Sequence, residues 1–175
     1  FCTDKSQREA ITDSFLRTTG AHRFNQLADT LRQLGITASD TKKETWSALF
    51  SSFNKKTMSH TREFPSARRI LQELGKKGLT LFAVSSIPDE EFVEELKNRG
   101  LHQFFYAAKG GDKPGFLARL AKEGYSPLLL VGDTDYDEQT ARDAGLLFYR
   151  AGNDRRLLCL LNFFKEAFPD VENAS

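Results

Sequence analysis

The sequence lacks the features that mark several classes of protein. No apolar run approaches the roughly 18 residues that a membrane-spanning helix needs, and no secretory signal peptide is visible. The 25 basic and 24 acidic residues leave a net charge of +1, so no overall field would attract nucleic acid or an acidic membrane. We therefore expect a soluble cytoplasmic protein that binds neither nucleic acid nor a membrane.

Cysteine and methionine are scarce. Cys2 and Cys159 lie far apart and form no metal-binding motif, so we expect free thiols in a reducing compartment. The single methionine is Met58, and the chain begins at Phe1. A natural cytoplasmic product starts with Met, or with a small residue exposed after Met removal. We therefore expect that the natural N-terminus is missing from this chain.

What is present indicates a globular fold. With 39% hydrophobic and 28% charged residues, the chain has the composition of an ordered domain rather than of a disordered segment. Its 175 residues are enough for one ordinary domain, or for a core with a small insertion.

The first 63 residues show helical periodicity and no candidate strand. Glycines at 20 and 35 separate the expected helices, and a third helix follows the polar start signal at residues 37–40. Apolar residues recur at helical spacings in the first two helices: Phe15, Leu16, Phe24, Leu27, Leu31 and Leu34. The pattern predicts a small all-helical cap formed by residues 1–63.

The pattern changes at Phe64-Pro65, after which helices and short apolar runs alternate. The expected strands are 79–84, 104–108, 128–131 and 147–149, and the expected helices are 66–74, 89–99, 114–123, 137–144 and 154–168. Short strands that alternate with helices of this length are typical of a parallel sheet with helices on both faces. Residues 64–175 therefore predict an α/β, Rossmann-like core.

Polar residues of three kinds follow the expected strands. Ser85 and Ser86 follow the run 79–84, Lys113 precedes Pro114 in the next loop, and Asp133 and Asp137 follow the run 128–131. Ligands of open α/β sheets bind at the carboxyl ends of the strands. Hydroxyl, ammonium and carboxylate groups there suit a phosphate and a magnesium ion, because magnesium prefers oxygen ligands and keeps several waters.

Each of these residues also has an ordinary structural interpretation. A serine after a strand commonly caps a turn, and Lys113 could be a solvated lysine in a glycine-rich loop. Asp137 could simply favour the start of a helix that Asp133 and Thr134 cap. The hypothesis of a site therefore depends on the order of all the residues together.

That order resembles the haloacid dehalogenase-like hydrolase superfamily, in particular phosphoglycolate phosphatase-like members with a helical cap. Ser85 matches the second motif of the family, Lys113 with Pro114 matches the third, and Gly132-Asp133-x-x-x-Asp137 matches the fourth. The resemblance implies that Ser85, Ser86 and Lys113 bind phosphate and that Asp133 and Asp137 form the magnesium site. It further implies a magnesium-dependent hydrolase of a small phosphorylated metabolite, with Ser85, Lys113 and Asp133 as catalytic residues.

The first motif of the family, a strand that ends in Asp-x-Asp-x-Thr/Val, is absent from this sequence. In the family it supplies the nucleophile that forms an aspartyl-phosphate and the general acid. The segment from Phe1 to Gly20 resembles the part that follows this motif, so we expect the motif directly before Phe1. The alternative is a catalytically inactive binding protein, a pseudophosphatase. A monomer or a homodimer is expected in either case.

Overall fold

The computed structural model of this protein describes residues 4–17, 23–33, 35, 39–126 and 128–167. The chain divides between Arg62 and Glu63 into two compact units. Within the described ranges, no helix combines the length and the apolar character needed to cross a membrane.

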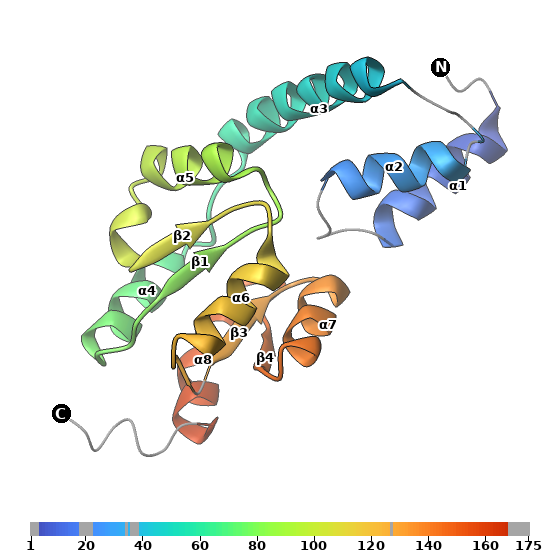
Figure 1. Cartoon of the computed structure of the whole chain (residues 1–175). Coiled ribbons are helices and arrows are strands. Elements are labelled where there is room, and N and C mark those ends of the chain that lie inside the picture. Colours follow the sequence, from blue (N-terminus) through green and yellow to red (C-terminus); the bar gives the residue numbers. More distant parts are fainter. Residues whose placement is uncertain (1–3, 18–22, 34, 36–38, 127, 168–175) are drawn as a thin grey trace. The chain divides into compact units, whose positions relative to one another are not determined.

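The described residues of the first unit form helices and no strand. The helices described there are α1 (Lys5–Arg17), α2 (Arg23–Gln33) and α3 (Asp40–His60). α1 and α2 lie side by side (Figure 1), and Ser14 of α1 and Leu31 of α2 are buried. On α3, Leu49 and Phe53 are exposed. The helical content agrees with the periodicity of the sequence, and the role of this unit as a cap stays a prediction.

In the second unit, helices and strands alternate along the chain. The elements are α4 (Ala67–Lys76), β1 (Phe82–Val84), α5 (Asp89–Asn98), the 3-10 helix η1 (His102–Phe104), β2 (Ala107–Lys109), α6 (Lys113–Lys122), β3 (Leu129–Gly132), α7 (Asp135–Asp143), β4 (Leu147–Arg150) and α8 (Asp154–Ala167). Each expected strand is found, although the first is shorter than its apolar run.

The strands form two separate parallel pairs. In one sheet β1 pairs with β2, and Phe82 lies opposite Ala107. In the other β3 pairs with β4, and Gly132 lies opposite Arg150. The parallel direction is as predicted, but the strands do not form one continuous sheet: across the described residues no backbone ladder connects β1 to β3. Each of these two strands therefore has one edge without ladder hydrogen bonds.

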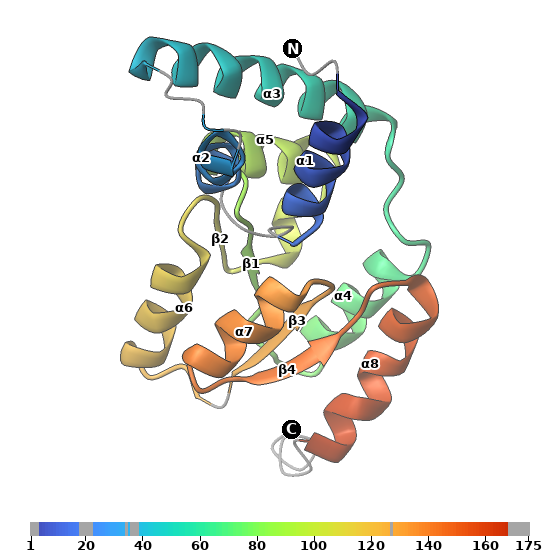
Figure 2. The same cartoon turned by 90° about the vertical axis from the view of Figure 1, so that its right-hand side faces the viewer.

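Helices cover the strands on both faces, which confirms the predicted α/β class (Figures 1 and 2). One face is held by α4 and α8, whose buried residues Ile70, Leu74, Leu160 and Phe164 pack with Leu81 and Leu129. On the other face, Leu117 of α6 and Ala141 of α7 form a cluster with Leu130, and Val84 packs against it. Both clusters contain residues at or next to β1 and β3, so side chains connect the two sheets.

The expected strand 104–108 starts later in the structure: Phe104 ends the 3-10 helix η1, and β2 begins only at Ala107. Phe104 N donates to Leu101 O and Phe105 N donates to His102 O, which closes a short 3-10 turn. Pairing with the first strand begins only at Tyr106, whose N–H donates to Leu81 O at 2.8 Å. The sequence of the aromatic run 104–106 therefore predicts a strand, but only its last residue, Tyr106, forms a backbone hydrogen bond with the segment of β1.

Of the two cysteines, Cys159 is a free, exposed thiol on α8, as expected. Cys2 lies outside the described residues.

Candidate active site at the carboxyl ends of the strands

A buried ion pair lies where the carboxyl ends of the two sheets meet. Lys113 is the first residue of α6, after β2, and its Nζ donates to Oδ1 of Asp137 in the first turn of α7, after β3. The helix of Lys113 is capped by Asp112, which accepts a hydrogen bond from Gly115 N at 2.9 Å. The Lys113 ammonium also lies 5.9 Å from the centroid of the Tyr136 ring. The sequence thus folds Lys113 back over the sheet edge rather than into solvent.

The second carboxylate oxygen of Asp137 is held by its own loop. It accepts hydrogen bonds from Thr134 Oγ1 at 2.8 Å, Thr134 N at 3.1 Å and Asp133 N at 3.2 Å. Asp137 N donates in return to Thr134 Oγ1, which completes a capping box at the start of α7. Burial raises the pKa of Asp137, but Lys113 and the Thr134 hydrogen bonds outweigh burial and lower it overall. Asp137 is therefore an internal anchor that stays ionised.

The close approach of Asp137 requires a glycine at position 132. A Cβ built on Gly132 would lie 2.6 Å from Asp137 Cβ and 2.7 Å from its carboxylate. The last residue of β3 must therefore lack a side chain for the Asp137 carboxylate to reach Lys113 and the loop amides together.

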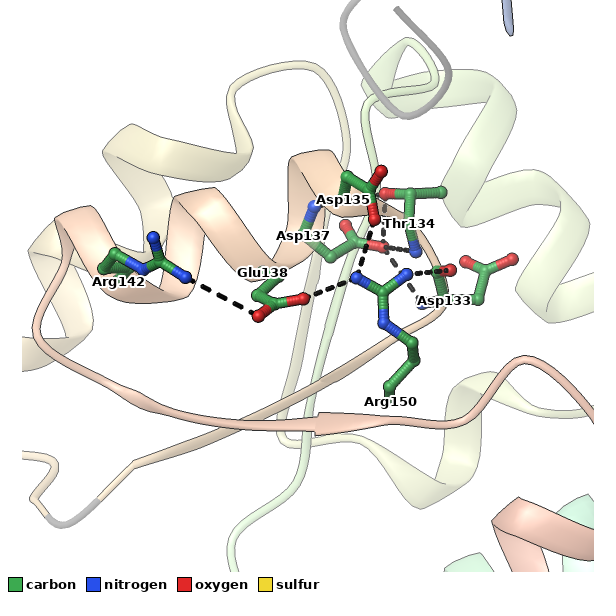
Figure 3. A network of polar contacts seen from close by, with 7 residues as sticks. All are labelled: Asp133, Thr134, Asp135, Asp137, Glu138, Arg142 and Arg150. Atoms are coloured by element: carbon green, nitrogen blue, oxygen red, sulfur yellow. Dashed lines mark hydrogen bonds and ion pairs between the residues drawn. The ribbon is translucent and has the colours of Figure 1, made fainter. Parts of the chain in front are cut away.

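Asp133 presents an available carboxylate beside this anchor. Its backbone is fixed at both ends, because its N–H donates to Asp137 and its carbonyl accepts from Arg150 Nη1 at 3.2 Å. Its side chain is exposed and makes no hydrogen bond or ion pair with any residue that the structure describes. Figure 3 shows this carboxylate directed away from the contacts around Arg150. Among the described residues, Asp133 thus presents a carboxylate that has a fixed backbone and no side-chain partner.

The two serines follow β1 at its carboxyl end. Ser85 N donates to Lys109 O at 3.1 Å, which extends the pairing of the strands by one bond. Ser85 Oγ accepts from Ile87 N at 3.2 Å, so the hydroxyl keeps its proton for an acceptor. Ser86 is the next residue of the same turn, and both serines are half-buried. A hydroxyl in this place can donate to a phosphoryl oxygen.

A second ion pair ties the serine turn to the loop that leads to Lys113. Asp89 accepts from Lys109 Nζ and from Gly110 N, each at 2.7 Å. Gly111 N donates to Ile87 O at 2.7 Å. A Cβ on Gly110 would lie 2.4 Å from Ile87 O, so this contact also requires a glycine. The turn after β1 and the loop after β2 are therefore packed as one layer.

The structure brings three of the five predicted residues into one network. Asp137 joins Lys113 to the Asp133 backbone, whereas no hydrogen bond or ion pair within the described residues joins Ser85 to Lys113 or Asp133. Arg150 and Asp89 were not predicted. Their signals in sequence are weak: Arg150 is a single charged residue at a strand end, and Asp89 is one of three acidic residues in the first turn of a helix, where acidic residues are common.

The residues present suit a magnesium ion in part. The described residues contain no group of three or more His, Cys, Asp or Glu side chains arranged to hold a metal. Magnesium is commonly bound through one or two carboxylates and keeps several waters or phosphate oxygens. The unpaired carboxylate of Asp133 fits such a partial site, and Asp137 links the backbone of Asp133 to the buried Lys113.

Residues 9–151 match the haloacid dehalogenase-like hydrolase family. Because the match covers most of the chain, this protein belongs to that family of hydrolases, as the motifs in its sequence implied.

Individual relatives give finer comparisons. The chain is 29% identical over 92 residues to a phosphoglycolate phosphatase of Vibrio parahaemolyticus serotype O3:K6 (strain RIMD 2210633), a match over 47% of this chain and 40% of that protein. The chain thus spans well under half of this curated relative.

Solved structures share the fold at low identity. A predicted phosphoglycolate phosphatase from Haemophilus somnus 129PT matches with a TM-score of 0.64 and 17% identity, over 90% of this chain and 87% of the other. A putative beta-phosphoglucomutase from Thermotoga maritima matches with a TM-score of 0.59 and 20% identity, over 94% and 84%.

Proposed function

We propose that this protein is a magnesium-dependent phosphomonoester hydrolase of the cytoplasm that acts on a small phosphorylated metabolite, as a monomer or a homodimer. The main observation in support is the buried Lys113–Asp137 pair. It fixes the Lys113 ammonium and, through the Asp133 backbone, places the unpaired Asp133 carboxylate at the same edge of the strands. Membership of the hydrolase family and the phosphoglycolate phosphatase relative support the reaction class.

In this proposal each residue has one role. Lys113 neutralises charge on the phosphoryl group, and the hydroxyls of Ser85 and Ser86 donate to its oxygens. Asp133 holds the magnesium ion, and Asp137 orients both Lys113 and the Asp133 loop rather than contacting the ion through a free oxygen. When bound, the ion would neutralise charge on the phosphate and align it for in-line displacement.

The covalent step needs a nucleophilic carboxylate, and no Asp-x-Asp-x-Thr/Val motif in Phe1–Ser175 supplies it. We place it on a strand encoded upstream of Phe1, and the edges of β1 and β3 without ladder bonds are where such a strand could pair. A carboxylate oxygen would attack phosphorus as the ester P–O bond breaks, and a second upstream Asp would protonate the leaving alcohol. That Asp would then take a proton from the water that attacks phosphorus and releases phosphate.

The second candidate function is a binding protein without activity. The absence of an Asp-x-Asp-x-Thr/Val motif from the sequence favours it, because Lys113, Ser85 and Asp133 could bind a phosphorylated ligand without turning it over. The two candidates predict different outcomes once the upstream coding sequence is included.

The test compares p-nitrophenyl phosphate hydrolysis by Phe1–Ser175 and by a chain that includes the upstream residues, with and without magnesium. We expect turnover only from the extended chain and only with magnesium. Asp133→Asn should abolish it, whereas the matched control Asp143→Asn, at the far end of α7, should not. Inactivity of an extended chain whose upstream segment has no Asp-x-Asp-x-Thr/Val motif would favour the binding protein. Strong turnover by Phe1–Ser175 would overturn the upstream nucleophile.

A further inference from the structure

Four carboxylates crowd the loop after β3 and the first turn of α7: Asp133, Asp135, Asp137 and Glu138. The four side chains differ in their hydrogen bonds and ion pairs (Figure 3). Asp137 is held by Lys113 and Thr134, and Asp135 and Glu138 are both held by Arg150. Among the four, the Asp133 side chain alone has no partner in the part of the chain that the structure describes.

Arg150 reaches this loop from the neighbouring strand. It is the last residue of β4 and lies opposite Gly132 in the ladder, which places it at the same carboxyl edge. Its Nη2 donates to Asp135 Oδ1 at 2.8 Å and to Glu138 Oε2 at 2.5 Å, while Nη1 donates to Asp133 O at 3.2 Å. One guanidinium thus contacts two carboxylates and the backbone of the third acidic residue.

This geometry uses properties that arginine has and lysine lacks. The planar guanidinium offers several donors in a fixed arrangement, whereas an ammonium acts as a compact charge. Arg150 is also supported by the ring of Phe148, whose centroid lies 5.7 Å from Cζ. Its side chain is 32% exposed, less than those of Glu138 and Asp135 at 42% and 98%. The arginine is therefore the least exposed of these three side chains.

We propose that Arg150 is a positioning residue that makes Asp133 the cation-binding carboxylate of this loop. It does so in two ways: it pairs with Asp135 and Glu138, so that neither competes for a divalent cation, and it fixes the carbonyl of Asp133. The inference rests on the proposed function, in which Asp133 binds the cation. It adds Arg150, a residue that none of the motifs includes.

The proposal predicts that removal of Arg150 releases two competing carboxylates. Freed Asp135 and Glu138 would then bind the cation in place of Asp133. Loss of positive charge alone would tighten cation binding at Asp133 and leave its importance unchanged. The discriminating quantity is thus how strongly magnesium binding depends on Asp133, with and without Arg150.

The experiment titrates the 175-residue protein with magnesium alone and follows the backbone amides by 1H–15N NMR, which also reports whether each variant is folded. In the presence of Arg150, Asp133→Asn should weaken magnesium binding about tenfold or more; in an Arg150→Met background the same change should cost less than about threefold. The amide shifts should spread from Asp133 and Thr134 to Asp135 and Glu138 in Arg150→Met. Arg150→Lys, which keeps the charge, should fall between the two backgrounds.

Arg142→Met is the matched control. Arg142 also faces Glu138, at 3.6 Å, but is 70% exposed, so its loss should leave the dependence on Asp133 unchanged. An equal loss on Asp133→Asn in both Arg150 backgrounds would overturn the inference about Arg150 and leave the proposed function intact. No loss on Asp133→Asn in the presence of Arg150 would instead overturn the assignment of the cation to Asp133, and with it both proposals.

Discussion

The ammonium of Lys113 and the carboxylate of Asp137 form an ion pair whose side chains are only 10% and 5% exposed. Lys113 follows β2 and Asp137 follows β3, so the pair connects the carboxyl end of one two-stranded sheet to that of the other. Buried ion pairs are poor sources of net stability, yet removal of one partner is costly because a charge is left uncompensated. Substitution of either Lys113 or Asp137 should therefore destabilise the packing at this edge of the strands.

Removal of Asp137 should destabilise the protein more than removal of Lys113. Asp137→Ala leaves a buried ammonium and takes the acceptor from three loop donors, so we expect a loss of about 3–5 kcal/mol in the free energy of unfolding. Lys113→Met leaves Asp137 with those three donors, and we expect about 1–3 kcal/mol. Urea unfolding measures both. The exposed Lys109–Asp89 pair provides the control: Lys109→Met should cost about 1 kcal/mol or less, and a cost equal to that of Asp137→Ala would contradict the argument.

Stability should fall in acid through Asp137. Its pKa lies below the ordinary value of 3.8 in the folded protein, so the ionised form is favoured by folding. This contribution is fully present above the unfolded pKa and is lost as the pH falls through the folded pKa. In urea unfolding between pH 7 and pH 2, the difference between wild type and Asp137→Asn should be constant above about pH 5 and shrink below it. A difference that grows on acidification would refute the lowered pKa.

Gly132→Ala should disturb the site directly. The new Cβ would overlap Asp137, so either the carboxylate or the end of β3 must move. We expect a loss of about 1–3 kcal/mol in unfolding free energy. Gly75→Ala, in α4 with open space around it, should be neutral or stabilising by roughly 1 kcal/mol or less. Urea midpoints of the two variants test the contrast, and equal midpoints would show that Asp137 tolerates displacement.

The alternation of helices and apolar runs after Phe64 was enough to predict the α/β class, because each element has a strong period and a clear stop signal. The divided sheet could not be predicted, because pairing between strands depends on which segments meet in space. The early start of α7 at Asp135 has a local cause: Thr134 caps the helix through the Asp137 amide and so includes two more residues.

For the site, Lys113, Asp133 and Asp137 could be placed at one edge from their positions after strands. The different contacts of Asp133 and Asp137 could not be predicted. In sequence Asp133 and Asp137 are equivalent carboxylates, and only the contacts of Lys113 and Thr134 distinguish the anchor from the available ligand. Arg150 was missed because its partners come from a different strand and helix, so no local spacing reveals them.

The division of the strands into two pairs also determines how the second unit resists thermal fluctuation. Within each pair, directional backbone hydrogen bonds hold the strands together. Between β1 and β3, in the described part of the unit, cohesion comes from the two apolar clusters and from Lys113–Asp137. We therefore expect the unit to open first along the seam between the pairs, with each pair and its adjoining helices as one cooperative block.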